Sequence, residues 1–155
     1  MVVTEASQVK PTNKIVWDSK NLHVQTKHVE AGTSIFPGRL VKVGANDNDV
    51  IVATAASVVV GWAGYEQTMK KWRPATVDTT YVTDDQIAII NGPGIGIVGS
   101  LAIGATTVKG TPLTQAAAGE LTGAAVATDF IVALAEEYKA ESGSASQDIM
   151  VRSMI

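Results

Sequence analysis

Two short segments bracketed by glycines, 72 residues apart, constrain the fold of this chain more than any other feature. The first is Gly32–Gly38 and the second is Gly104–Gly110, and each places five residues between its two glycines before an apolar run. The same ungapped shift aligns four further pairs of apolar residues: Val41 with Leu113, Ala53 with Ala125, Val60 with Val132, and Ala63 with Ala135. This register predicts the internal duplication of one β-rich unit, over about 31–66 and 103–138. The alternative is a pair of similar turns in an unduplicated all-β protein.

The composition favours strands and tight turns. Apolar residues make up 46% of the 155 residues, charged residues only 17%, and there are 14 glycines. Val, Thr and Gly at this density suit short strands better than long solvated helices. We predict an all-β fold, a compact β-barrel-like or β-sandwich-like domain with pseudo-duplicated halves, over residues 21–155. So few charges for the expected surface area also suggest that a partner covers part of it.

The expected elements follow from the periodicity. Strands are expected over 22–29, 40–43, 76–83, 86–90, 95–98, 131–135 and 148–155, with two more within 50–60. Helix is expected only in short pieces, near 62–72 and at 136–141. In the first piece Tyr65, Met69 and Trp72 have helical spacing. In the second, helix-forming residues compete with the strand register of the repeat, and the repeat is preferred over 131–135.

Several function classes receive no support. The net charge of −3 offers no basic face for nucleic acid, and there is no cysteine for a disulfide or a thiolate site. His23 and His28 fall on opposite sides of a predicted strand, so they do not form a joint metal site. The paired acids Asp84 and Asp85 lie in a turn, where Asp is favoured for local hydrogen bonding alone. We expect no catalytic residue, no metal, no cofactor and no small-molecule substrate.

Neither a signal peptide nor a membrane span is expected. The first 20 residues lack an apolar core after a basic start, and the best apolar run, 53–64, is interrupted by polar residues. Synthesis in a cytoplasm is therefore expected, with no membrane partner.

One stretch imitates a nucleotide-binding motif. Gly94–Gly99 has the spacing Gly-x-Gly-x-x-Gly after an apolar strand. The motif binds a dinucleotide only where a helix begins beside the pyrophosphate. Two more glycines, three β-branched residues in a row and a proline follow Gly99, and these do not form such a helix. A small nucleotide-binding domain using this stretch remains only as a less favoured alternative.

Two segments are candidates for contacts with a partner. Residues 1–20 have no sustained period and are predicted to be an extended arm that adds to a neighbouring subunit or a larger surface. Its candidate contact residues are Val2, Val3, Val9, Pro11, Ile15, Val16 and Trp17. The second segment is the only basic and aromatic cluster, Lys70, Lys71, Trp72 and Arg73. With few cations in an acidic chain, a protein contact or a plain exposed loop is preferred there over a nucleic-acid base.

The turn-and-strand pattern of 30–155 resembles the capsid cement, or head decoration, proteins of tailed viruses. The resemblance rests on four elements: Ala31–Val41 with its Pro37-Gly38 pair, Tyr81–Gly94 with an acidic turn and Pro93-Gly94, Gly104–Leu113 with the later Gly119–Thr122, and the last strand Ile149–Arg152. Residues 1–29 and 62–80 lie outside it. The resemblance implies a non-enzymatic β-barrel-like protein, often a homotrimer, that binds the major capsid protein on the outside of the virion. Another virion β-structural protein, such as a tail or fibre subunit, has the same turn pattern and is the competing reading.

Overall fold

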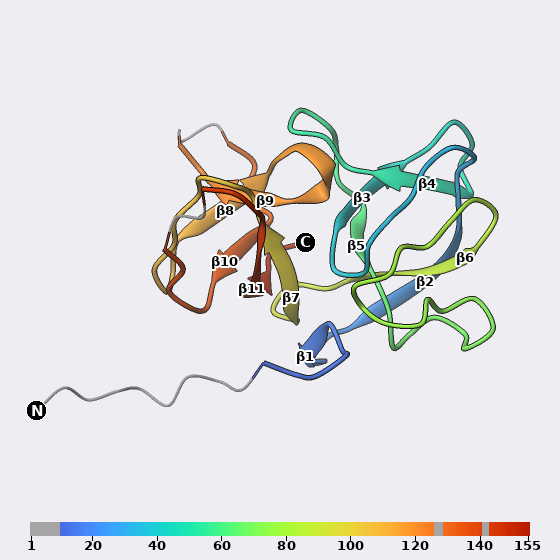
Figure 1. Cartoon of the computed structure of the whole chain (residues 1–155), viewed down its shortest axis with the longest axis horizontal. Coiled ribbons are helices and arrows are strands. Elements are labelled where there is room, and N and C mark those ends of the chain that lie inside the picture. The colour runs from blue at the N-terminus through green and yellow to red at the C-terminus, as the bar shows by residue number, and fades with distance from the viewer. Residues whose placement is uncertain (1–9, 126–128, 141–142) are drawn as a thin grey trace, which may run out of the picture.

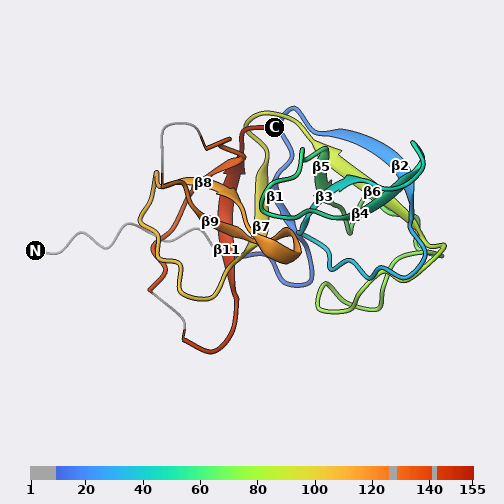
Figure 2. The ribbon, with the colours of Figure 1, turned by 90° about the horizontal axis from the view of Figure 1, so that it is seen from above.

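The computed structural model describes residues 10–125, 129–140 and 143–155, and these form two closed five-stranded β-barrels side by side (Figures 1 and 2). The first barrel consists of β2 (His23–Val29), β3 (Leu40–Val43), β4 (Asp49–Val52), β5 (Gly61–Ala63) and β6 (Gln86–Asn91). The second consists of β7 (Gly96–Leu101), β8 (Pro112–Gln115), β9 (Leu121–Gly123), β10 (Ala133–Ala135) and β11 (Gln147–Ser153). A short strand, β1 (Val16–Asp18), is added to the edge of β7. The all-β prediction is confirmed.

The two barrels have the same topology, so the pseudo-duplication of the fold is confirmed. Hydrogen-bonded neighbours follow the order β2-β4-β3-β5-β6 in the first barrel and β7-β9-β8-β10-β11 in the second. The pairing of β3 with β5, Leu40 opposite Trp62, is repeated 72 residues later between Pro112 and Leu134. The duplicated region is therefore larger than the two glycine segments: it covers 23–91, which holds β2–β6, and 96–153, which holds β7–β11.

The glycine segments are equivalent turns. Gly32, Gly38 and Gly104 all have φ of +80° and Gly110 has +89°, a left-handed conformation that L-residues with a Cβ rarely adopt. The Gly38 amide donates to the Ala63 carbonyl at 2.8 Å, and the Gly110 amide donates to the Ala135 carbonyl at 2.7 Å. Glycine is needed at these sites because the chain reverses tightly before β3 and before β8.

The shift of 72 holds for three of the five strand pairs, because it is 62 between β6 and β11 and changes by one residue between β4 and β9. The Ala53 amide donates to the Leu40 carbonyl, and its structural counterpart is Ala124, whose amide donates to Pro112. The prediction that Ala53 matches Ala125 is therefore wrong by one residue. The cause is the β8–β9 turn, which holds the 3₁₀ helix η1 (Ala117–Gly119) and is one residue shorter than the β3–β4 turn, as the pairs Val43–Val50 and Gln115–Leu121 show.

Each barrel has its own core, and the two cores correspond. In the first barrel Val29, Val41, Val50, Ala63, Ile87 and Ile89 are buried, and in the second Leu101, Leu113, Leu121, Ala135, Ile149 and Val151 occupy the matching positions. These side chains come from alternate positions of their strands, as the two-residue period of a strand requires.

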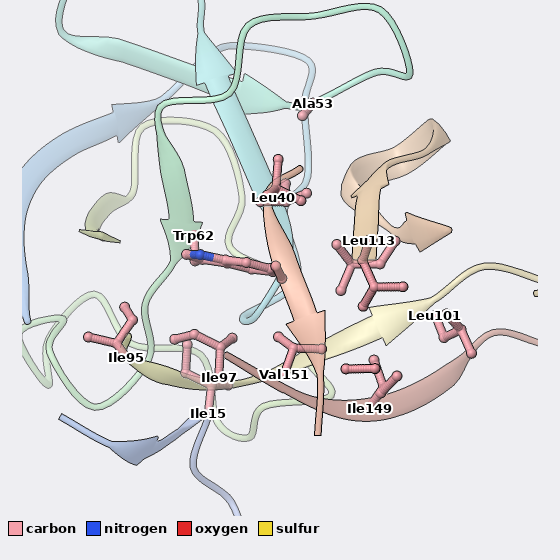
Figure 3. Close-up of a cluster of buried hydrophobic side chains, with 14 of the residues drawn as sticks. Ile15, Leu40, Ala53, Trp62, Ile95, Ile97, Leu101, Leu113, Ile149 and Val151 are labelled. Atoms are coloured by element: carbon pink, nitrogen blue, oxygen red, sulfur yellow. The ribbon is translucent and has the colours of Figure 1, made fainter. Parts of the chain in front are cut away.

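A further apolar cluster joins the barrels (Figure 3). Trp62 on β5 is fully buried among residues of the second barrel, including Ile95 and Ile97, and Ile15 from the N-terminal segment packs against the same cluster. The Trp62 indole N–H donates to the Ser153 hydroxyl of β11 at 3.0 Å. The junction is thus part of a continuous hydrophobic core.

Several local predictions are wrong. Within the described residues there is no α-helix, so no helix forms at 62–72 or at 136–140, while residue 141 of the second expected piece lies outside the described residues. Residues 64–80 form turns instead, and Tyr65, Met69 and Trp72 lie in two successive turns, closed by the Thr68 amide on Tyr65 and by the Trp72 amide on Met69. Of the two strands expected in 50–60, only β4 forms, and Val58 is 85% exposed. The strand expected at 76–83 is reduced to one bridge, Tyr81 to Ile35.

The equivalent turns give a matched pair of substitutions. A Cβ at Gly38 would lie 2.4 Å from the Val98 carbonyl oxygen in the other barrel, whereas a Cβ at Gly110 meets nothing within 4 Å. Both Gly→Ala changes cost the left-handed strain of about 1–2 kcal/mol, and Gly38→Ala adds an overpacking cost of about 1–3 kcal/mol. Urea denaturation should therefore show a clearly larger loss of unfolding free energy for Gly38→Ala. Equal losses of unfolding free energy for Gly38→Ala and Gly110→Ala would contradict the different packing of these two equivalent turns.

Candidate interaction surface

The described residues form no group that suggests a chemical reaction. No three His, Asp or Glu side chains among them are placed to hold a metal ion. None of the helices found in these ranges could span a bilayer. Gly94–Gly99 leads into β7, a strand, and no helix begins after Gly99. Gly96 and Gly99 have packing roles, because a Cβ at Gly96 would lie 2.4 Å from the Trp17 ring and one at Gly99 would lie 3.0 Å from the Leu121 side chain.

The N-terminal segment packs against its own chain from Lys10 onward. The Ile15 side chain is 2% exposed, and its carbonyl accepts a hydrogen bond from Val98 at 2.7 Å. Val16 and Trp17 are half-buried on β1, and so is Pro11 ahead of it. Val2, Val3 and Val9 lie outside the described residues. Of the arm contacts predicted from the sequence, Ile15 is therefore already used within the chain, while Pro11, Val16 and Trp17 keep part of their surface.

Glu66 fixes the N-terminal segment to the first barrel. One carboxylate oxygen accepts the Ile15 amide at 2.5 Å, and the other accepts the Val16 amide at 3.3 Å. A carboxylate that accepts two backbone amides forms charge-assisted bonds, which are stronger than neutral ones. The segment is thus attached to both barrels, to β7 by backbone pairing and to the loop after β5 by Glu66.

Trp17 and Arg152 hold the other end of β1. The Trp17 indole N–H donates to the Ile97 carbonyl at 3.2 Å, and the Arg152 guanidinium lies 4.7 Å from the ring centroid. Arg152 also pairs with Asp18 at 3.0 Å, and this hydrogen bond lowers the pKa of Asp18 and raises that of Arg152. These contacts keep β1 antiparallel to β7.

The 64–80 loop is shaped by two tyrosines. The Tyr81 hydroxyl donates to the Gly64 carbonyl at 2.8 Å and lies 2.7 Å from the Thr68 hydroxyl, and burial raises the pKa of Tyr81 to about 12. The Tyr65 hydroxyl reaches the Pro74 and Ala75 carbonyls, each at 3.1 Å. The loop therefore has a defined path although it contains no strand.

The predicted basic cluster divides into a structural part and an exposed part. Arg73 donates to the Glu66 carbonyl at 2.8 Å and the Thr68 carbonyl at 2.9 Å and stacks 5.4 Å from the Tyr65 ring centroid, so it supports the loop. Lys70 and Lys71 are exposed, and Lys71 lies 4.9 Å from the centroid of the half-buried Trp72 ring. Only these three residues of the cluster are available to a partner.

The structure brings the two predicted contact segments together. Asn13 of the N-terminal segment accepts the Val77 amide at 3.0 Å through Oδ1, and its Nδ2 donates to the Tyr65 hydroxyl at 3.4 Å. We call the exposed residues of 10–14 and 69–78 the arm–loop surface. Beside it, an open groove of about 330 Å³ lies between the N-terminal segment and both barrels and is lined by residues including Lys10, Pro11 and Asp148.

The residues that build this surface were not identified from the sequence. Glu66 lies 51 residues from Ile15 and Asn13 lies 64 residues from Val77, and neither belongs to a motif. No local pattern in the sequence marks either residue.

Comparisons with known proteins support the fold. No protein-family model matches this sequence, and no curated protein matches it significantly. Among solved structures, the chain is similar to the N base of head fibre gp8.5 of bacteriophage phi29. That match has a TM-score of 0.53 and 14% sequence identity and covers 85% of this chain and 93% of that chain. At this identity the likeness concerns the fold.

Removing the Glu66 carboxylate should release the N-terminal segment. Glu66→Ala leaves the Ile15 and Val16 amides without their acceptor, which should cost about 1–3 kcal/mol of unfolding free energy. Hydrogen exchange should show faster exchange at these two amides, with β2–β6 unaffected. Asp78→Ala, an exposed carboxylate of the same loop, is the control and should leave both amides protected.

The buried Tyr81 should make stability pH-dependent at alkaline pH. An unfolded tyrosine ionises near pH 10, whereas the folded Tyr81 ionises only at about 12. The unfolded state therefore loses its proton first, and the free energy of unfolding should fall as the pH rises above about 10. Tyr81→Phe should remove this slope and lower stability at pH 7 by about 1–3 kcal/mol, because the Gly64 carbonyl loses its donor.

Denaturation at pH 8 and at pH 11 measures both effects. Tyr138→Phe, at a tyrosine that is 69% exposed, is the control. An unchanged slope in Tyr81→Phe would contradict the role of this hydroxyl.

Proposed function

We propose that this protein is a non-enzymatic virion structural protein that binds the outside of a viral capsid and stabilises the shell. The observation that carries the proposal is the two-barrel fold, which is similar over most of both chains to a protein described as the base of a phage head fibre. The capsid exterior is the proposed location, after synthesis in the host cytoplasm. The major capsid protein is the proposed partner, with a homotrimer as the proposed soluble state.

The arm–loop surface is the proposed contact with the shell. It joins a backbone segment fixed by Asn13 and Glu66 to the exposed Lys70 and Lys71 and the half-buried Trp72. Aromatic and cationic residues on a fixed loop can supply the apolar and charged contacts that protein interfaces use. A surface built on hydrogen-bonded loops also loses little conformational entropy on binding.

A second candidate is a base subunit of a fibre. It is favoured because the similar structure is the base of a head fibre. The two candidates differ in what the protein binds: a decoration protein binds empty expanded shells without any other component, whereas a fibre base also binds further fibre chains, and a subunit of a tail fibre copurifies with tails.

Reversing charge on the loop tests the proposed contact. The double change Lys70→Glu, Lys71→Glu should weaken binding to expanded empty shells at least tenfold, about 1.4 kcal/mol, because it reverses the only exposed cations beside Trp72. Lys109→Glu makes the same change on the second barrel, at a side chain that is 66% exposed, and should bind as the unchanged protein does.

Cosedimentation with shells and with purified tails measures both candidates. Equal binding of all variants to shells would remove the loop from the contact. Binding to tails and not to shells would replace the first candidate with the second.

A further inference from the structure

Two equivalent strands of this molecule have very different surroundings. All six residues of β7 in the second barrel are buried. In β2, its counterpart in the first barrel, His23, Val24, Gln25 and Thr26 are all exposed. The strand order around both is the same, so the difference comes from what packs against each strand. Trp62, Gly38 and Trp17 pack against β7 at the junction of the barrels. The two strands also differ in what lies along their outer edges.

The outer edge of β7 is occupied along its length. β11 lies on one side, with Gly96 opposite Arg152. On the other side β9 reaches only the end of the strand, at Leu101. β1 fills the remainder, where Ile97 pairs with Val16 and the Val98 amide donates to the Ile15 carbonyl.

The outer edge of β2 is occupied only at its end. β6 lies along one side, with Val24 opposite Ile90, and β4 reaches the other side only at His28 and Val29. The His28 amide donates to the Asn48 carbonyl on the β4 side. In a strand, residues two apart direct their amides to the same side, so Thr26 and Val24 also direct theirs away from β6. Within residues 10–125, 129–140 and 143–155, the backbones of Val24 and Thr26 make no hydrogen bond on the side away from β6.

We propose that the edge of β2 at Val24–Thr26 binds an extended strand from a second copy of this chain, and that this strand is the N-terminal segment 2–9. The position is the one that β1 occupies in the second barrel, so the fold already contains one filled copy of the site. An unpaired strand edge binds such a segment through main-chain hydrogen bonds.

The side chains at the two edges select different segments. Trp17 covers Gly96, where a Cβ would approach the ring to 2.4 Å, and the counterpart of Gly96 in β2 is Val24. A strand with tryptophan at that point therefore does not fit β2. Residues 2–9, Val-Val-Thr-Glu-Ala-Ser-Gln-Val, contain small and β-branched side chains and no aromatic ring, which suits an edge that carries a valine.

The path of the chain places the donor in another copy. From β1 the chain runs back to Lys10, which pairs with Asp148. Asp148 lies opposite Ser100, beyond the point where β1 pairs with β7. Lys10 thus lies beyond the start of β1, whereas β2 follows the end of β1 (Figure 1). The binding segment (2–9) and the edge that binds it (Val24–Thr26) are different parts of the chain. Every edge is therefore filled only when the copies close into a ring.

Sedimentation equilibrium of the full chain and its variants tests the inference. The full chain should self-associate, and Val24→Lys, Thr26→Pro and deletion of 2–9 should each weaken association at least tenfold. Lysine and proline are devices that block pairing at strand edges, where the fold tolerates them. Combining Thr26→Pro with the deletion should weaken association no further than either alone. Val43→Lys is the matched control, because Val43 and Val24 are both 47% exposed.

A peptide of residues 1–9 supplies a direct readout. It should bind the protein that lacks 2–9, and Val24→Lys in that protein should weaken binding at least tenfold, with Val43→Lys unchanged. Melting temperatures identify variants that fail to fold, and Val24→Lys decides the result if Thr26→Pro is one of them. A monomeric full chain, equal effects of the two lysine substitutions, or peptide binding unaffected by Val24→Lys would each overturn the inference. Shell binding is scored separately, so a chain that binds shells as a monomer retains the proposed shell-binding role and loses this inference together with the proposed homotrimer.

Discussion

The packing of Trp62 between the barrels determines the arrangement of the rest of the molecule. Its backbone belongs to β5 of the first barrel, while its ring is fully buried against the second and its N–H bonds to Ser153. Truncating so large a buried side chain costs about 3–5 kcal/mol in other proteins. The ring needs space on β7, where a Cβ on Gly99 would lie 3.4 Å from it. Because Trp62 fixes β7 against the first barrel, it also fixes the groove in which the N-terminal segment lies.

The duplication explains the topology, and departures from it explain the surfaces. Leu134 replaces Trp62 in the second barrel and is only half-buried. Gly38 is buried at the junction and its counterpart Gly110 is open. In each pair, one copy faces the other barrel and the second faces outward. When the two copies of a duplicated unit pack against each other, each face that one copy uses at the junction remains free on the other copy. These free faces are where a partner can bind.

Sequence reasoning succeeded where the determinant was local. Left-handed turns need glycine, so Gly32, Gly38, Gly104 and Gly110 could be placed from the sequence. It failed where distant contacts decide. The 53–60 stretch has strand-like composition, but its backbone bonds to β3 only at its two ends, through the Ala53 and Val60 amides, and no second strand forms there. The helical spacing after β5 gave way to hydrogen bonds from Tyr81 and Arg73 that no local pattern shows. Glu66 was missed for the same reason, since an acid that binds a remote backbone leaves no periodic signal.

The few charged residues of this chain are used largely for internal attachment. Arg39 on the first barrel pairs with Glu120 beside η1 at 2.7 Å, and Arg152 joins Asp18 and Glu136, both at 3.0 Å. Both clusters join segments far apart in the sequence. With these charges paired inside the chain, recognition of a partner depends on backbone edges, apolar side chains and a few exposed lysines. Such contacts depend on shape and strand pairing, which suits the proposed role as a virion structural protein.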